Sequence, residues 1–504
     1  MHAEEPVDLL IVGSGLMGAA VARSVREQRP HARIVMIAGG PTVGPVAGQH
    51  LHDVTDPEVW DQYNKRVSSG VQAFYTGVAP SAETGASMQG VTPGMYHLTS
   101  LGEDAEEMPS ASVAWNAGGM GIHWTAATPF PWGSEITPHI APEEWERDLV
   151  RAAELLEVNR EPYPQTEAGR AVVRTLAGHF DPRSAAGRGV QDMPMAVNPD
   201  ETGLKVRTSP SVIFPPVGTP GLDGRFTLVT DTIATSILHE NGRATGAECR
   251  DVAAGRTSTI RARQVVVCAD TVRTPQLLFA SGIRPEALGR YLNEHFFLTG
   301  IVDADPERLG FDLSGLVPPT DHEWASDCLW VPHSDADQPY QVHLMNKVVT
   351  DEEGRPARYA VGIEYYIRTE IQRENRLEFS DDEVDATGMP RIRVHFRYSE
   401  SDRANLELAR GDQATAARLL GDFDPETQSA VLGAGGSLHL TGTVRMGPVD
   451  DGTSVCDLDC RVWGFDNLFV AGNGVIPTAL VCNSTLTGMT TAVRAATAVV
   501  RALA

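Results

Sequence analysis

The strongest constraint on the fold lies in the first 38 residues of this 504-residue chain. The apolar run VDLLIV at residues 7–12 is typical of a parallel strand that is covered on both faces. The glycine pattern GSGLMG at residues 13–18 follows, then a segment with helical apolar spacing, and then the run RIVMIA at residues 33–38. Strand, G-x-G-x-x-G, helix and strand within about 30 residues is the layout of a dinucleotide-binding fold.

Each glycine of this pattern has a distinct task. Gly13 permits the tight turn after the strand, Gly15 lets the backbone approach a pyrophosphate, and Gly18 lets helix and strand pack closely. The helix begins with free N–H groups and the positive end of its dipole, and both favour phosphate. We therefore expect Gly13, Ser14, Gly15 and Gly18 to bind the cofactor.

One part of the dinucleotide-binding pattern is missing. An acidic residue about 20 positions after the glycines usually binds the ribose hydroxyls, but Ala38, Gly39 and Gly40 stand there. A ribose contact must therefore come from another part of the chain. The pattern does not by itself distinguish FAD from NAD.

Charge and cysteine content narrow the partners and the compartment. The 41 Lys and Arg residues against 66 Asp and Glu residues give a net charge of −25, which argues against nucleic acid and anionic membranes as partners. The six cysteines show no CxxC spacing, so we expect reduced cysteines in a cytoplasmic protein. The sequence shows no signal-peptide pattern and no apolar window of about 18 residues, so we expect no transmembrane helix.

Residues 50–110 are irregular and rich in Gly, Ser, Thr and Pro, and the sequence leaves open whether they form a lid over a site or a solvated excursion. The histidines of QHLHD at residues 49–53 lack a second ligand set at a supporting spacing. We interpret them as surface or lid residues and expect no metal site. Gly118 and Gly119 then bring the backbone close to a flat or bulky group. The adjacent HWT at residues 123–125 raises the expectation of ligand contact.

The remaining segments predict an α/β protein with two lobes. Residues 225–248 indicate two strands joined by a turn at residues 240–243, and residues 264–269 indicate a buried strand. This strand leads to a helix start with Pro275 in its first turn. Residues 300–440 alternate strand-like runs with polar turns, which predicts an antiparallel sheet with helices beside it and a substrate-binding role.

Near the C-terminus, His439 lies in the Gly/Thr-rich segment HLTGTVRMG, an apolar strand ends at Gly472 and Asn473, and Asn483 opens a helix. Histidine is the natural base near neutral pH, but a structural histidine in a turn gives the same pattern. Asn483 could likewise serve only as a helix N-cap.

Several segments together resemble the glucose–methanol–choline (GMC) oxidoreductase family. They are VVVCADTVRTPQLLFASGI, LGRYLNEH, HLTGTVRMG and NLFVAGNGVIPT. Within that family the sequence is most similar to pyranose oxidases and bacterial glycoside 3-oxidases, through GGMGIHWTAATP, IRTEIQRENRLEFSDDEVDATGMP and CNSTLTGM. The resemblance implies a Rossmann-like FAD-binding domain, discontinuous in sequence, at residues 1–49, 111–135, 205–301 and 440–504. It leaves a substrate-binding domain with a lid segment at residues 50–110, 136–204 and 302–439.

The resemblance also implies roles for individual residues. His439 matches the catalytic base, and Asn483 matches the residue that holds the sugar oxygen beside it. Asn473 stands where the family often has Asp. His123 matches a histidine that is covalently attached to the flavin in some pyranose oxidases, and linkage in this chain stays open. The full set of implied cofactor contacts is Gly13, Ser14, Gly15, Gly18, Gly118, Gly119, His123, Trp124, Thr125, Ala126, Ala234, Ala269, Gly472, Asn473, Ser484 and Thr485.

The implied reaction is transfer of a hydride from a secondary sugar hydroxyl to FAD, giving a keto-sugar, with O₂ then reduced to H₂O₂. We expect oxidation at C3 of glycosides, C-glycosides included. The alternatives are a pyranose 2-oxidase acting on free sugars and a dehydrogenase with a quinone or protein acceptor. A non-redox member of the hydroxynitrile lyase type and a non-enzymatic flavin protein are the remaining alternatives. The sequence leaves the oligomeric state open.

Overall fold

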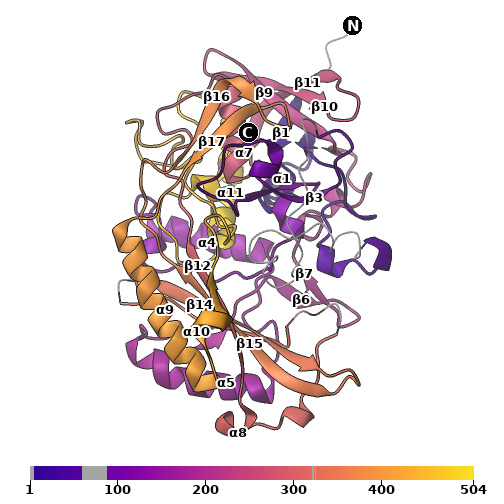
Figure 1. Cartoon of the computed structure of the whole chain (residues 1–504). Helices are drawn as coiled ribbons and strands as arrows, with labels where there is room; N and C mark the ends of the chain where they lie inside the picture. Colours follow the sequence, from indigo (N-terminus) through magenta and orange to yellow (C-terminus); the bar gives the residue numbers. More distant parts are fainter. Residues whose placement is uncertain (1–4, 60–87, 321–322, 324, 336) are drawn as a thin grey trace.

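The computed structural model describes residues 5–59, 88–320, 323, 325–335 and 337–504. Two separate sheets lie toward opposite ends of the molecule, one holding β1 and β11 and the other holding β14 and β15 (Figure 1). The first sheet has seven strands and the second has six. This arrangement confirms the predicted α/β fold with a Rossmann-like lobe and an antiparallel lobe. The predicted domain boundaries themselves stay a prediction.

The first sheet combines parallel and antiparallel pairing around one long strand. The second half of β11 pairs in parallel with β1 and β19, and its first half pairs antiparallel with β10. Strand β2 pairs in parallel with β1 and β8, so the Rossmann part is parallel as the N-terminal pattern predicts. The strands are β1 (Val7–Val12), β2 (Ile34–Ile37), β8 (Phe226–Val229), β9 (Thr232–Glu240), β10 (Arg243–Asp251), β11 (Thr257–Val267) and β19 (Leu468–Val470).

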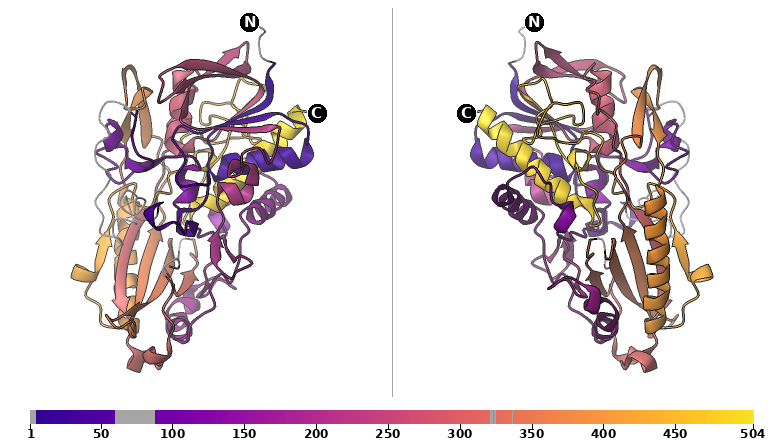
Figure 2. Two further views of the ribbon diagram at one scale, coloured as in Figure 1. Left: turned by 90° about the vertical axis from the view of Figure 1, so that its right-hand side faces the viewer. Right: turned by 90° about the vertical axis from the view of Figure 1, so that its left-hand side faces the viewer.

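Helices α1 (Leu16–Gln28) and α11 (Ser484–Ala502) pack against each other beside this sheet, and α4 (Pro142–Leu155) packs on α11 (Figure 2). Small residues of α1 at positions 18–22 are buried and allow a close approach. Helix α11 is buried on nearly every side, as expected for a helix that is apolar all round. The N-terminus of α11 therefore has a fixed position beside the first sheet.

The second sheet has the order β18-β12-β15-β14-β13-β5 and is antiparallel. Helices α5 (Glu167–Phe180) and α9 (Glu400–Leu420) contribute to its apolar core. Strand β12 belongs to this sheet, although it begins before residue 301, where the predicted nucleotide-binding segment ends. The strands are β5 (Gln191–Asp192), β12 (Phe296–Asp303), β13 (Asp327–Val331), β14 (Tyr340–Thr350), β15 (Pro356–Ile367) and β18 (Ser429–Val431).

Three two-stranded sheets and several short helices complete the described fold. The pairs are β3 (Gly94–His97) with β4 (Ser112–Trp115), β6 (Val197–Pro199) with β7 (Lys205–Arg207), and β16 (Arg376–Val384) with β17 (Pro390–His395). The short helices are α6 (Pro210–Ile213), α8 (Pro306–Leu309) and α10 (Pro425–Gln428). No helix among the described residues is both long and apolar enough to cross a membrane. All six cysteines are buried and unpaired.

Two local predictions were wrong. Helix α7 (Asp270–Ala280) begins five residues before Pro275, because the Asp270 carboxylate accepts hydrogen bonds from the amides of Val272 and Arg273 and caps it. Pro275 lacks the N–H that would bind the Thr271 carbonyl, and this oxygen instead accepts from the hydroxyl of Thr443 at 2.5 Å.

For the QHLHD segment, the surface interpretation is also wrong, whereas the lid interpretation stays a prediction. His50 is fully buried, with its Nε2 atom 2.8 Å from the Trp124 carbonyl, and Asp53 forms a buried ion pair with Arg207. No group of metal-ligating side chains exists among the described residues. Part of the predicted lid, residues 60–87, lies outside the described residues.

Candidate active site

A cavity of about 350 Å³ runs from the carboxyl ends of β1, β2 and β11 toward the second sheet. In open α/β sheets, ligands bind at this end of the strands. Most predicted site residues line the cavity: Gly13, Ser14, Gly15, Gly119, His123, Trp124, Thr125, Ala234, Ala269, His439, Gly472, Asn473, Asn483 and Thr485. Four predicted contacts do not line it, namely Gly18, Gly118, Ala126 and Ser484.

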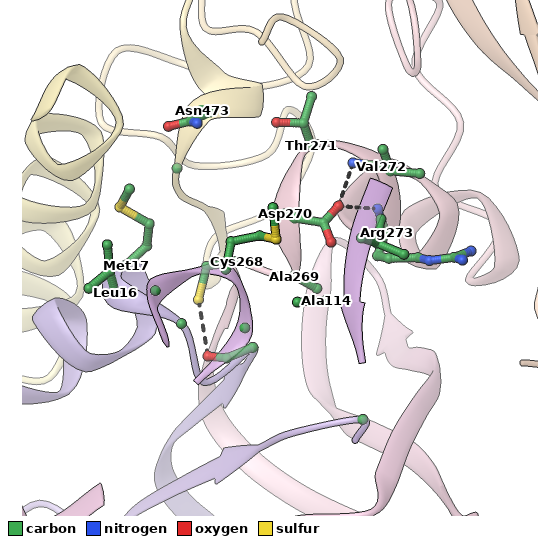
Figure 3. Close-up of a pocket in the computed structure, with 18 of the residues that line it drawn as sticks. Leu16, Met17, Ala114, Cys268, Ala269, Asp270, Thr271, Val272, Arg273 and Asn473 are labelled. Atoms are coloured by element: carbon green, nitrogen blue, oxygen red, sulfur yellow. Dashed lines mark hydrogen bonds between the residues drawn. The ribbon is translucent and has the colours of Figure 1, made fainter. Parts of the chain in front are cut away.

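The glycine-rich turn forms one end of the cavity. Gly13 has φ +113°, and a Cβ atom there would lie 2.3 Å from the carbonyl oxygen of Cys268. A Cβ atom on Gly18 would lie 2.1 Å from the Gly13 carbonyl oxygen, so Gly18 serves helix–strand packing rather than ligand contact. Gly15 at the N-cap of α1 has no side-chain cap, and Leu16 and Met17 begin the helix beside the pocket (Figure 3). The α1 amides are thus left for a ligand.

Two of the four predicted contacts outside the lining, Gly118 and Ser484, form hydrogen bonds to residues within it. The Gly118 amide donates to the Ser14 hydroxyl at 2.9 Å, which joins the glycine-rich turn to the short helix η3 (Gly119–Ile122). Ser484 accepts a hydrogen bond from the Asn473 side chain at 2.8 Å. These contacts hold two walls of the cavity in place.

The end of β11 forms another wall. Cys268 and Ala269 lie between Met17 on one side and Asp270 on the other (Figure 3). Asp270 has φ +66° and supplies an exposed carboxylate in the cavity lining. Ala38, Gly39 and Gly40, which stand where the ribose acid is missing, line the same cavity.

His123 occupies a buried corner of the cavity. The Asn116 side-chain amide donates to the carbonyls of Ala117 and Gly119, so its oxygen faces His123 Nε2 at 2.7 Å. Because that oxygen only accepts, His123 Nε2 carries a proton. Burial lowers the pKa of His123 to about 3, so the ring is neutral. The neighbouring Trp124 donates to the Thr208 carbonyl at 2.9 Å and is thereby fixed.

His439 and Asn483 meet near the second sheet. Asn483 Nδ2 lies 3.3 Å from His439 Nε2. Asn483 stands at the N-cap position of α11, but its side chain does not cap the helix. The alternative of a simple N-cap side chain is therefore wrong. His439 is half-buried and lines the cavity.

The surroundings of His439 keep it uncharged. Burial lowers its pKa well below the ordinary value, and the nearby imidazoles of His295 and His343 lower it further. Tyr366 covers the ring at a centroid distance of 5.4 Å. A neutral imidazole can accept a proton, which a base requires.

Sequence reasoning missed several polar residues around this pair. His295 Nδ1 lies 3.3 Å from His439 Nδ1, and Gln341 Nε2 lies 3.0 Å from Asn483 Oδ1. Glu135, which is fully buried, accepts hydrogen bonds from the amides of Val481 and Cys482 just before Asn483. The segment LGRYLNEH drew attention to His295 only as part of a family motif, and no local pattern marks Gln341 or Glu135.

The cavity fits the FAD that the sequence implies. The uncapped α1 N-terminus and the closely packed Gly13 turn suit a pyrophosphate, and the cavity continues from there to His439. Asn473 lines the cavity, and its Oδ1 atom is buried without a protein hydrogen-bond partner in the described chain. Such groups normally have partners, which a ligand with many hydroxyls could supply.

Comparisons with known proteins agree with this geometry. Residues 156–297 and 372–492 match the sequence models of GMC oxidoreductases. A C-glycoside 3-oxidase of Microbacterium trichothecenolyticum is 38% identical, and the match covers 97% of this chain and 96% of the relative. A pyranose 2-oxidase of Tricholoma matsutake is 28% identical, and the match covers 98% of this chain and 93% of the relative. A solved formate oxidase from Aspergillus oryzae RIB40 shares the fold, with a TM-score of 0.64 at 13% identity over 99% of both chains.

Proposed function

This chain belongs to the GMC oxidoreductase family, and from that premise we propose that it oxidises the C3 hydroxyl of glycosides with FAD. The observation that carries the proposal is the neutral His439 beside Asn483 in the cavity that begins at the glycine-rich turn. The choice of C3 and of glycosides rests on full-length similarity to a C-glycoside 3-oxidase, which exceeds that to a pyranose 2-oxidase.

The two side chains divide the work on the substrate hydroxyl. His439 Nε2 accepts the hydroxyl proton, and the Asn483 amide donates to the same oxygen and stabilises its developing negative charge. Bound FAD would supply the hydride acceptor, N5 of its isoalloxazine ring. The hydroxyl proton stays on His439 while the carbon becomes a ketone. O₂ then takes two electrons and two protons to give H₂O₂.

Three groups of residues would hold the cofactor. The turn from Gly13 to Gly15 and the α1 N-terminus would bind the pyrophosphate, and Asn473 would bind near the ribityl chain. His123 would lie beside the flavin ring. A covalent bond through His123 Nε2 requires loss of its hydrogen bond to Asn116. Flavin that stays in the pellet after acid precipitation of the protein would demonstrate such a bond.

Anaerobic flavin reduction tests the assignment of the base. We expect His439→Ala holoenzyme to keep FAD and to be reduced by an O-glycoside on the order of 10³-fold more slowly than the wild type. His139→Ala is the matched control, because His139 is exposed and lies outside the cavity lining. Near-normal flavin reduction in His439→Ala would remove His439 from the mechanism.

A further inference from the structure

Two hydrogen-bond chains converge on the His439 ring, and each begins at a group that can act in only one way. The first begins at the backbone carbonyl of Leu480, which can only accept. The second begins at the indole N–H of Trp330, which can only donate. Together with a neutral His295 ring, the two starting groups determine every donor and acceptor along the way.

The first chain assigns the proton on Nδ1 of His439. His295 Nε2 lies 3.1 Å from the Leu480 carbonyl oxygen, so this nitrogen carries a proton. Burial lowers the pKa of His295 to about 4, so the ring is neutral and its Nδ1 atom has a lone pair. His439 Nδ1 lies 3.3 Å from that lone pair and must therefore be the donor.

The second chain assigns the lone pair on Nε2 of His439. Trp330 Nε1 donates to Gln341 Oε1 at 2.9 Å, which orients the Gln341 amide. Gln341 Nε2 then donates to Asn483 Oδ1 at 3.0 Å, which orients the Asn483 amide. Asn483 Nδ2 is thus a donor toward His439 Nε2 at 3.3 Å. The two chains give the same answer independently.

We propose that His295, Gln341 and Trp330 are positioning residues that hold His439 as the Nδ1–H tautomer, with its Nε2 lone pair toward the cavity. Trp330, Gln341 and His295 are all buried, so water does not compete for these hydrogen bonds. The role in the reaction rests on the proposed function, whereas the tautomer itself does not depend on it.

This arrangement suits a base before and after it takes a proton. Before the reaction, the substrate hydroxyl takes the place of the Asn483 N–H at the single lone pair of Nε2, which then accepts the hydroxyl proton without a change of tautomer. Afterwards, the Nδ1–H of the imidazolium still faces a lone pair of His295 rather than another N–H. The Asn483 amide has a second hydrogen, so it can donate to the substrate oxygen without turning over.

A pair of substitutions at one position separates hydrogen-bond direction from shape. Gln341→Met removes the donor toward Asn483, and Gln341→Glu replaces it with a group that accepts. A carboxylate oxygen at position 341 accepts a hydrogen bond from the Asn483 NH₂ group. This favours the Asn483 amide in the reversed orientation, with its oxygen toward His439. We expect flavin reduction by an O-glycoside to be about tenfold slower in the Met variant and on the order of 10²-fold slower in the Glu variant. A purely structural cost of a buried carboxylate would appear equally in Gln413→Glu, whereas loss of the hydrogen-bond direction is confined to position 341.

The same two substitutions at Gln413 serve as the control. They measure the effect of replacing a buried glutamine in the same lobe at a position away from the cavity. Gln413 is buried, donates to the Ile363 carbonyl and accepts from Ser429, but it does not line the cavity. We expect Gln413→Met and Gln413→Glu holoenzymes to be reduced within threefold of the wild-type rate, about the scatter of remote sites. Equal losses at positions 341 and 413 would overturn the positioning role.

The tautomer can be measured without substrate. The holoenzyme labelled with ¹⁵N-histidine is compared with His439→Ala to assign the His439 signals. We expect a protonated Nδ1 and an unprotonated Nε2, and a protonated Nε2 would overturn the proposal. If the tautomer is as expected but no glycoside reduces the flavin, the proposed function fails and the hydrogen-bond assignment stands. If glycosides reduce the flavin but Nε2 is protonated, the assignment alone fails.

Discussion

Glu135 offers the sharpest test of how the fold positions Asn483. Its fully buried carboxylate accepts from the amides of Val481 and Cys482 at 2.5 and 2.7 Å through one oxygen. The other oxygen accepts from the Trp132 amide at 2.8 Å and lies 2.9 Å from His333 Nε2. One side chain therefore holds the backbone that leads into Asn483. We predict that Glu135→Gln lowers both stability and activity.

The structure gives the size of the stability loss. Burial alone would raise the pKa of Glu135, but the charge of His333 and the hydrogen bonds outweigh it and lower the pKa from 4.5 to about 2. A depression of this size corresponds to roughly 3 kcal/mol of folding free energy at neutral pH. In Glu135→Gln the amide NH₂ replaces the oxygen that faces the Trp132 amide, and one buried N–H is left without an acceptor. That second effect costs about 1–3 kcal/mol.

Denaturant unfolding and anaerobic flavin reduction of the holoenzyme would measure the two effects. We expect the free energy of unfolding to fall by about 3 kcal/mol or more. We expect flavin reduction to slow on the order of 10²-fold, because small displacements of a catalytic group are costly. Glu146→Gln is the control, since Glu146 is exposed on α4 and should change stability by less than about 0.5 kcal/mol.

The pH dependence adds a second check on the Glu135 reasoning. A carboxylate with a depressed folded pKa contributes stability that is present above its unfolded pKa of 4.5 and is lost as pH falls toward 2. The stability difference between wild type and Glu135→Gln must therefore narrow below pH 4.5. Equal stability of the two proteins at neutral pH would refute the reasoning.

Two further predictions follow from the same structure. Gly13 has φ +113°, and Gly13→Ala places a Cβ atom 2.3 Å from the Cys268 carbonyl oxygen. We therefore expect the purified variant to contain less than a tenth of the wild-type flavin per protein. Normal flavin content would contradict the account of the turn. Burial lowers the pKa of His123, His295 and His343 to about 3, 4 and 3. Their contribution to stability is thus present above the unfolded pKa of about 6.5 and is lost as pH falls below it. The loss of stability by about pH 5 amounts to roughly 2 kcal/mol per histidine. An unfolding free energy that does not change between pH 7 and pH 5 would contradict this.

Local patterns were sufficient for the Rossmann part of the fold. The bounds of β1 agree with the predicted strand, and those of β2 differ from it by one residue at each end. Position in a family motif directed attention to His439 and Asn483, and the structure brings them to 3.3 Å. These features depend on residues close together in the chain or on long motifs, so the sequence displays them directly.

The supporting residues could not be found in this way. Glu135 binds amides 346 and 347 positions away, and Gln341 binds Asn483 at a separation of 142. Neither residue stands in a local pattern, because its role arises only when the two lobes pack. The start of α7 was misplaced for a related reason: Asp270 caps the helix in a left-handed conformation that is uncommon for residues other than glycine.

The position of the ketone in the product tests the central claim most directly. The holoenzyme is mixed with an O-glycoside, a C-glycoside and the corresponding free sugar, first without O₂ to follow flavin bleaching and then with O₂ to accumulate product for NMR. We predict bleaching by the glycosides, a ketone at C3 and one H₂O₂ per ketone. A ketone at C2 formed only from the free sugar, or no bleaching by any of the three compounds, would contradict the account.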